Sequence, residues 1–329
     1  MDALFRARNL TEVVNKIKTV KTEILDIVFG RKKYQTSSLI SWDVKSGTER
    51  ILKNLKAADP AQIQKTAGKA MITVEAPRFA PKRFIPASKL DSLRRLGDVA
   101  PELIADAVND ELTDMKAAID RTREFQAAKA LSGQIVDDAG VVLVDYGFSG
   151  TQTPTLAGKA KWTDSESNPL TAIRAWKKII IQAVGDVSRF VAFCPSDVMD
   201  SLLTNPALSE LIKYNIGAQV AEQGRIATVA GVEIHEILGS YLDSSAVRHD
   251  MVAATYFILV GIAPENAAEM YAPVVDLADP NGVGKGQAAS MFFSKSWDEE
   301  DPSGRWIKAE ARPLPALLKP ECVVYAKVQ

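Results

Sequence analysis

The sequence predicts an α+β fold, because strand-like and helical runs alternate irregularly along the chain rather than in regular βαβ units. Two observations favour it: one long helical run covers residues 101–132, and strand-like runs at 190–194, 226–238 and 255–261 follow it. The chain has 329 residues, of which 47% are hydrophobic and 25% are charged. Such a length and composition are typical of a folded protein with two lobes.

Charge and cysteine content exclude several classes of protein. The chain has 40 Lys and Arg against 41 Asp and Glu, a net charge of −1. A nearly neutral chain is not built as a whole to bind nucleic acid or an anionic membrane. Cys194 and Cys322 lie in no metal-ligand spacing, so we expect two buried, reduced thiols. No apolar run approaches ~18 residues and no signal peptide is evident, so we expect a cytoplasmic origin.

Residues 1–35 predict a basic amphipathic arm. Its apolar residues recur at helical spacing: Leu10, Val13, Val14, Ile17, Val20 and Ile24. Thr11 is a candidate cap of this helix. A basic amphipathic helix can bind a membrane or an acidic surface, but we favour a helix that packs on a neighbouring chain. The short apolar cluster that ends at Phe29 also needs a partner surface.

Residues 36–90 predict two strands and a stiff strap. SSLISWDV and GKAMITVEA are strand-like, and the polar stretch 45–68 between them suggests a long hairpin. In RFAPKRFIPASKL, basic residues alternate with aromatic residues, and such a pattern can bind single-stranded nucleic acid. Prolines stiffen this segment into an extended strap. We therefore favour a contact between subunits over nucleic-acid binding.

Residues 101–132 give the strongest helical signal. Pro101 suits a first turn, Gly133 suits a stop, and the apolar stripe between them comprises Ile104, Val108, Leu112, Met115 and Ile119. At 1.5 Å per residue this helix would be roughly 48 Å long. Such a length predicts a spine helix across the molecule.

Further elements follow from the same rules. Asn168-Pro169 opens a helix that runs through Ala183 and is closed by Gly185. Phe190 to Cys194 predicts a buried strand, and Ser196 is a candidate N-cap of the next helix. Near the end of the chain, alternation predicts one strand with Ile307, Ala309 and Ala311 on one face and Trp306, Lys308, Glu310 and Arg312 on the other.

Candidate chemical groups are few. His235 and His249 lack a second histidine at metal-site spacing, so we interpret both as structural or exposed. The loop 282–286 lacks the Ser or Thr of a phosphate loop. The acidic run 298–301 could recruit a cation, but a solvated turn is favoured. We find no constellation of acid, base and stabiliser, and therefore predict no enzyme and no cofactor.

The end of the chain, MFFSKSWDEEDPSGRWIKAEARPLPALLKPECVVYAKVQ, resembles the C-terminus of the lambda-type major capsid protein E family of tailed phages. Three other segments resemble that family in the same order: KTEILDIVFGRKKYQTSSLISWDV, APKRFIPASKL with the long helix, and RFVAFCPSDVMDSLLTNPAL. The resemblance covers nearly the whole chain. Its specificity comes from the order of the segments, because no single motif is a strict signature.

The resemblance implies the Hong Kong 97 fold, also called the Johnson fold. It assigns an N-terminal arm to residues 1–35, an extended loop and strap to 36–95, and a peripheral domain with the spine helix to 96–185. An axial domain follows at 186–275, and the strands of 276–329 return to the peripheral domain.

The function implied is a non-catalytic subunit of an icosahedral phage head, built from hexamers and pentamers and assembled in the host bacterial cytoplasm. Expected partners are a scaffolding protein, a portal, enclosed double-stranded DNA bound without sequence specificity, and a decoration protein in some relatives, but no membrane. Alternatives are an encapsulin-like nanocompartment shell and an α+β enzyme. The predicted interface residues are Ile17, Ile24, Phe29, Trp42, Arg78, Phe79, Arg83 and Phe84.

Two consequences follow from this interpretation. Deletion of residues 1–30 is expected to leave a foldable subunit that assembles poorly, since the apolar face of the arm would act between chains. Charge reversal at Arg78 and Arg83 is expected to weaken shells more than it weakens folding of the subunit.

Overall fold

The computed structural model describes residues 6–17, 21–46, 68–92, 101–185, 187–215, 226–243, 245–279 and 289–329. The chain forms two compact units. The first comprises Met1–Ile40, Thr73–Ala127 and Ala268–Ala316, and the second comprises Ser41–Ile72, Ala128–Ala267 and Leu317–Gln329. Each unit is therefore assembled from segments that lie far apart in the sequence.

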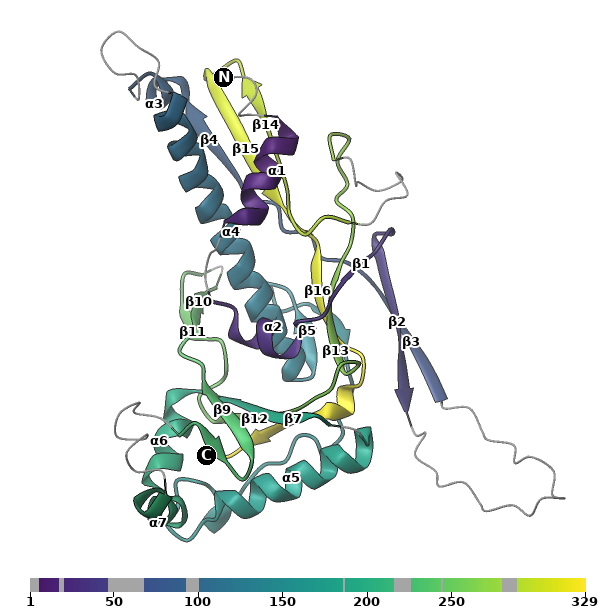
Figure 1. The fold of residues 1–329 in the computed structure, drawn as a ribbon, viewed down its shortest axis with the longest axis vertical. Coiled ribbons are helices and arrows are strands. Elements are labelled where there is room, and N and C mark those ends of the chain that lie inside the picture. Colours follow the sequence, from purple (N-terminus) through teal and green to yellow (C-terminus); the bar gives the residue numbers. More distant parts are fainter. Residues whose placement is uncertain are drawn as a thin grey trace, which may run out of the picture. The chain divides into compact units, whose positions relative to one another are not determined.

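The first unit is built on a long helix and a three-stranded sheet beside it (Figure 1). Its helices are α1 (Ala7–Lys16), α2 (Glu23–Val28), α3 (Ala87–Ser92) and α4 (Pro101–Leu131), whose last residues enter the second unit. The sheet has the order β14–β15–β4, with β4 (Lys82–Pro86), β14 (Phe293–Glu299) and β15 (Gly304–Glu310) all antiparallel. α4 confirms the predicted spine helix.

The core of this unit lies between α4, α1 and the inner face of the sheet. Four residues of the predicted stripe are buried together in it: Val108, Leu112, Met115 and Ile119. Ile307, Ala309 and Ala311 meet them from the other side, as alternation predicted. Leu10 and Val14 of α1 complete the cluster. The apolar face of the first arm helix is thus covered by its own subunit.

Two smaller sheets also include residues of the first unit. One has the order β1–β13–β16, formed by β1 (Lys32–Tyr34), β13 (Ala267–Tyr271) and β16 (Pro313–Leu317). The other pairs β2 (Leu39–Ser46) with β3 (Gly68–Glu75), which confirms that the two predicted strands pair. Thr11 does not cap α1, because the helix begins at Ala7. Its hydroxyl instead donates to the carbonyl of Ser294, at 3.2 Å.

The second unit contains a five-stranded mixed sheet of order β17–β12–β7–β9–β8. Its strands are β7 (Arg189–Cys194), β8 (Thr228–Val229), β9 (Val232–Glu236), β12 (Tyr256–Ile262) and β17 (Val323–Lys327). Two hairpins pair β5 (Gln134–Val136) with β6 (Val142–Asp145), and β10 (Ser240–Leu242) with β11 (Arg248–Asp250). The helices are α5 (Pro169–Val184), α6 (Ser196–Thr204) and α7 (Pro206–Asn215), with short 3₁₀ turns at Gly158–Ala160 and Pro320–Cys322.

Helix α5 packs on this sheet through an aromatic cluster. It begins at Pro169, as predicted, and the Asn168 side chain caps it by accepting a hydrogen bond from the N–H of Thr171. Its end is set by Gly185, whose φ of 80° disfavours a side chain. Trp176 on its buried face meets Trp162 and Phe257 of β12, with ring centroids 5.9 and 6.1 Å away. Ser196 is the first helical residue of α6 rather than its N-cap, which is Pro195.

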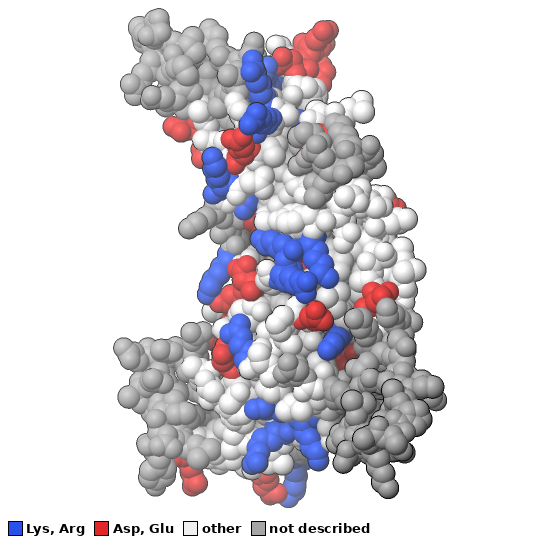
Figure 2. All heavy atoms as spheres, turned by 45° about the vertical axis from the view of Figure 1, so that its right-hand side comes forward, with Lys and Arg blue, Asp and Glu red and all other residues white. Residues whose placement is uncertain are grey.

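Chemical groups are sparse among the residues described. No group of three or more His, Cys, Asp or Glu residues there could hold a metal ion. None of the helices described is long and apolar enough to cross a bilayer. The loop 282–286 lies outside the described residues. Figure 2 shows basic and acidic side chains interspersed over the visible face, as expected from the nearly neutral composition.

Candidate functional site: the anchor of the N-terminal arm

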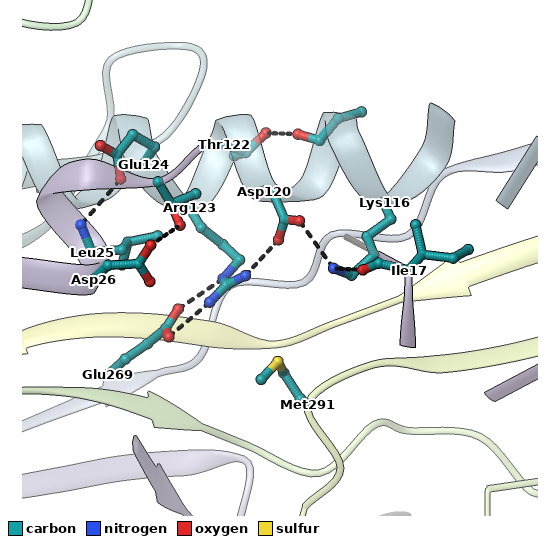
Figure 3. Close-up of polar contacts among 12 residues, drawn as sticks. Ile17, Leu25, Asp26, Lys116, Asp120, Thr122, Arg123, Glu124, Glu269 and Met291 are labelled. Carbon is teal, nitrogen blue, oxygen red and sulfur yellow. Dashed lines mark hydrogen bonds and ion pairs between the residues drawn. The ribbon is translucent and has the colours of Figure 1, made fainter. Parts of the chain in front are cut away.

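The N-terminal arm is fastened to α4 at two points, one just after α1 and one at the start of α2 (Figure 3). At the first, the Nζ of Lys116 in α4 donates to the carbonyl of Ile17, at 2.8 Å. At the second, the carboxylate of Glu124 accepts from the N–H groups of Ile24 and Leu25, at 2.8 and 3.1 Å. Both anchors bind backbone groups that lie about 100 residues away in the sequence.

The second anchor works as a helix cap supplied by another helix. The first N–H groups of a helix have no partner within it and carry partial positive charge, so a carboxylate there is favourable. Glu124 is only 7% exposed, however. Burial raises the pKa of its carboxyl to about 7, the two backbone hydrogen bonds lower it, and Asp26 and Glu23 raise it further. The anchor therefore holds an acid that titrates near neutral pH.

A buried ionic cluster is centred on Arg123, the residue directly before Glu124 in α4. The guanidinium of Arg123 donates to both carboxylate oxygens of Glu269 in β13, at 2.7 and 2.8 Å, and to the hydroxyl of Tyr271, at 2.7 Å. Asp120 bridges Arg123 to Lys116. Burial alone opposes the charge of Arg123, but the hydrogen bonds and charge of Glu269 outweigh it and raise its pKa. This cluster ties α4 to β13.

A second ionic cluster binds the strap to the sheet. Arg78 forms a bidentate pair with Glu310, at 2.7 and 3.0 Å, and Lys308 donates to the same carboxylate. Lys308 and Lys295 also pair with Asp276. Burial would raise the pKa of Asp276, yet hydrogen bonds from these two lysines and from the backbone lower it to about 2.

The arrangement can clamp segments together. In these clusters the cations are paired with carboxylates, and the hydroxyl of Tyr271 accepts from Arg123 and donates to Glu269. Burial raises the pKa of each cysteine thiol to about 12, so neither is a reactive thiolate at neutral pH. Breaking a buried pair by removing one partner is costly, so these contacts fix how the arm and strap dock.

The predicted interface residues fall into two groups. Ile24, Phe29 and Trp42 are buried within the chain, and Ile17 packs against the core cluster. The indole of Trp42 donates to the carbonyl of Leu317, at 3.1 Å. Ile24, Phe29 and Trp42 are thus covered by the chain itself, whereas Ile17 stays partly exposed.

The strap residues are more accessible. Arg78 and Arg83 have side chains about half exposed, and Arg83 pairs with Glu111 and Asp114 of α4. Phe79 forms a β-bridge to Ala311, and Phe84 packs on Trp306 with ring centroids 5.1 Å apart. An interface at these eight residues remains a prediction.

The anchoring residues Lys116, Asp120, Arg123 and Glu124 were not singled out from the sequence. A signal was nevertheless present, since charges at spacings of three and four follow the apolar stripe along one side of the helix. Their partners Ile17, Ile24 and Glu269 lie about 100 to 146 residues away, so sequence spacing could not pair them.

Several known structures share this architecture. A prophage protein of Escherichia coli CFT073, assigned as a capsid protein, matches with a TM-score of 0.67 and 16% identity over 98% of this chain and 99% of that one. A phage-related protein of Bordetella bronchiseptica RB50 matches at 0.59 and 13% identity, over 98% and 97%. A virus-like particle from Pyrococcus furiosus matches at 0.51 and 10% identity, over 99% and 98%. No curated protein sequence matches the chain.

An arm fastened to a long helix, on an α+β fold shared with these proteins, is the architecture of the Hong Kong 97 type. The model of the family described as phage major capsid protein E matches residues 6–328, and the chain belongs to that family. It is a bacteriophage capsid protein whose place is the virion shell. The same match disfavours the nanocompartment alternative.

Proposed function

We propose that the chain assembles into hexamers and pentamers that close an icosahedral head around double-stranded DNA, without catalysis and without a cofactor. The observation that carries the proposal is the match of the capsid family to residues 6–328. A net charge of −1 suits a wall that encloses DNA, because tight phosphate binding would impede packing and release. Assembly in the host bacterial cytoplasm, with a separate scaffolding protein and a portal, belongs to the same proposal, and a decoration protein is an optional addition.

The arm (1–35), extended loop and strap (36–95), peripheral domain (96–185), axial domain (186–275) and return strands (276–329) are proposed as the working parts of the subunit. The strap and sheet offer a surface for the neighbouring subunit. Phe84, Trp306 and Trp297 form one row across β4, β15 and β14, and all three are partly exposed. Partly exposed aromatic residues are enriched at protein interfaces.

The proposal is tested by expressing the chain alone, and also together with any neighbouring phage or prophage gene that encodes a small acidic protein. We expect closed shells or capsomer rings by negative-stain electron microscopy. A uniform monomer or small dimer under both conditions would overturn the assembly proposal. Nuclease-protected DNA in particles from infected cells tests the enclosed partner.

A further inference from the structure

The exposed face of α5 carries a groove that the shell function has not used. Its helix positions Leu170, Arg174, Lys178 and Ile181 are spaced by four, four and three residues, so they line one side of α5. The turn between β8 and β9 closes the far side, and the hollow has a volume of about 570 Å³. The stripe from Leu170 to Ile181 is roughly 16 Å long, about three helical turns.

Lys177 connects the two walls of the groove. Its Nζ donates to the carbonyl of Ala230, at 2.9 Å, and lies 4.8 Å from the centroid of the Phe190 ring. Ala230 and Gly231 both have positive φ, of 51° and 71°, so the turn that presents this carbonyl is tightly specified. This hydrogen bond ties the β8–β9 turn to α5, so both walls of the groove are in place without a ligand.

The groove combines exposed cations with partly exposed apolar side chains. Arg174 and Lys178 are exposed, and no acidic residue among those described lines the groove or pairs with them. At the two ends of the same stripe, Ile181 is 45% exposed and Leu170 is partly exposed. An anionic partner that carries apolar side chains would complement both kinds of group.

We propose that this groove docks an acidic amphipathic helix of a partner protein. Helix-in-groove recognition combines apolar anchors on one helix face with charges beside them. An acidic helix of this kind would complement both the two cations and the apolar side chains at the ends of the stripe. A DNA backbone would use the cations but gain nothing from Leu170 and Ile181. The inference rests on the proposed function, because a shell subunit meets partner proteins as it assembles. The groove would be the binding site for one of those partners.

A labelled synthetic peptide of about 18 residues, long enough to cover the stripe as a helix, tests the proposal. The peptide carries Leu at helical spacing flanked by Glu, and fluorescence anisotropy measures its binding to the full chain. A scrambled peptide of the same composition and a short DNA duplex are the comparison probes. We expect the ordered peptide to bind at least about tenfold more tightly than either, which is about 1.4 kcal/mol.

Matched variants assign the binding to the groove. Arg174→Gln with Lys178→Gln should weaken binding about tenfold, and Ile181→Ser about threefold. The control pair, Lys159→Gln with Arg248→Gln, removes the same charge from exposed positions of the same unit and should leave binding unchanged.

Absence of peptide binding would overturn the proposal. Equal binding of the scrambled peptide or of DNA, or indifference to Ile181→Ser, would show a general polyanion surface and overturn it as well. Electron microscopy of the same samples reports shells separately, so a subunit that forms shells but ignores the peptide refutes the groove alone.

Discussion

At the scale of single residues, Arg78 and Arg83 look alike in the sequence but differ in their partners. Arg78 pairs with Glu310, whose carboxylate is 0% exposed, whereas the partners of Arg83 retain exposure of 15% and 65%. A buried carboxylate that loses its partner keeps its desolvation cost, while a surface pair contributes little. The expectation that both arginines affect assembly more than folding is therefore revised for Arg78.

Arg78→Ala should lower the free energy of unfolding of the subunit by about 2 kcal/mol, because Lys308 remains as the other partner of Glu310. Arg83→Ala is the matched control and should lower it by less than about 1 kcal/mol. Urea titrations of the two unassembled variants, followed by tryptophan fluorescence, give the comparison. Equal urea midpoints would contradict the distinction between the two sites.

Glu124 makes the arm anchor sensitive to pH. Its pKa is raised from 4.5 to about 7, so the folded state holds a proton that the unfolded state has released between these values. Stability from this group is complete below about pH 4.5 and is lost as pH rises through about 7, by about 3 kcal/mol at most. Asp26 and Glu23 of α2, which also raise its pKa, act in the same direction.

Glu124→Gln removes the charge and keeps one oxygen that can accept from Ile24 or Leu25, while an amide NH2 replaces the other carboxylate oxygen. The difference in unfolding free energy between this variant and the natural protein should therefore change between pH 5 and pH 8, in favour of the variant at the higher pH. Using the difference cancels the other titrating groups. A difference that stays constant across this range would show that Glu124 does not titrate there.

At the scale of elements, the spine helix and the paired strands could be predicted from the periodicity of the sequence. Residues close together in the chain decide which side of such an element is apolar and buried. β15 was harder. Alternation correctly placed Ile307 and Ala309 on the core face, but Lys308 and Glu310 on the other face are also buried, inside ionic clusters. Their partners Arg78 and Asp276 come from distant segments. From the sequence alone, the charged side chains of this strand were therefore expected to be exposed to water.

The arm shows the same limit. Its amphipathic pattern predicted a helix with one apolar face, and that helix is present. The pattern could not say which chain covers the face, because a subunit and its neighbour offer equally apolar surfaces. The structure places Leu10 and Val14 in the core of their own unit. Deletion of residues 1–30 would therefore remove part of that core, and the expectation of an intact fold is revised.

Leu10→Ala should lower the free energy of unfolding by about 3 kcal/mol, since it leaves a cavity between α1, α4 and the sheet. Val13→Ala, which shortens a partly buried side chain on the same helix, should cost less than about 1 kcal/mol. Thermal unfolding of unassembled subunits measures both. If Leu10→Ala left the melting temperature unchanged but prevented shells, the arm would act between chains after all.

At the scale of the whole molecule, the clusters inside the first unit and the aromatic row on its surface have different tasks. The ionic clusters hold the arm and strap to the unit, and their partners are buried. The row of Phe84, Trp306 and Trp297 instead leaves ring surface partly open. Lys82 lies 4.5 Å from the centroid of the Trp306 ring, which keeps a polar group beside this apolar surface. Stability of the subunit and affinity between subunits are therefore separable by mutation.

Trp297→Ala tests that separation. Trp297 stacks on Trp306 at 6.3 Å at the edge of the row, in the outer strand β14 of the three-stranded sheet. Loss of this ring should raise the subunit concentration needed for shell assembly about tenfold, as for a central aromatic residue of an interface, which is about 1.4 kcal/mol per contact. The free energy of unfolding of the isolated subunit should fall by less than about 1 kcal/mol.

Light scattering over a series of subunit concentrations gives the assembly threshold, and electron microscopy identifies the product. Val142→Ala is the control, because it trims an exposed aliphatic side chain in β6, outside the row. Assembly is cooperative over many copies of one contact, so a small loss per interface should be amplified in the threshold for closed shells. An unchanged threshold for Trp297→Ala, with the control also unchanged, would remove the aromatic row from the interface and leave the remaining strap residues as its candidates.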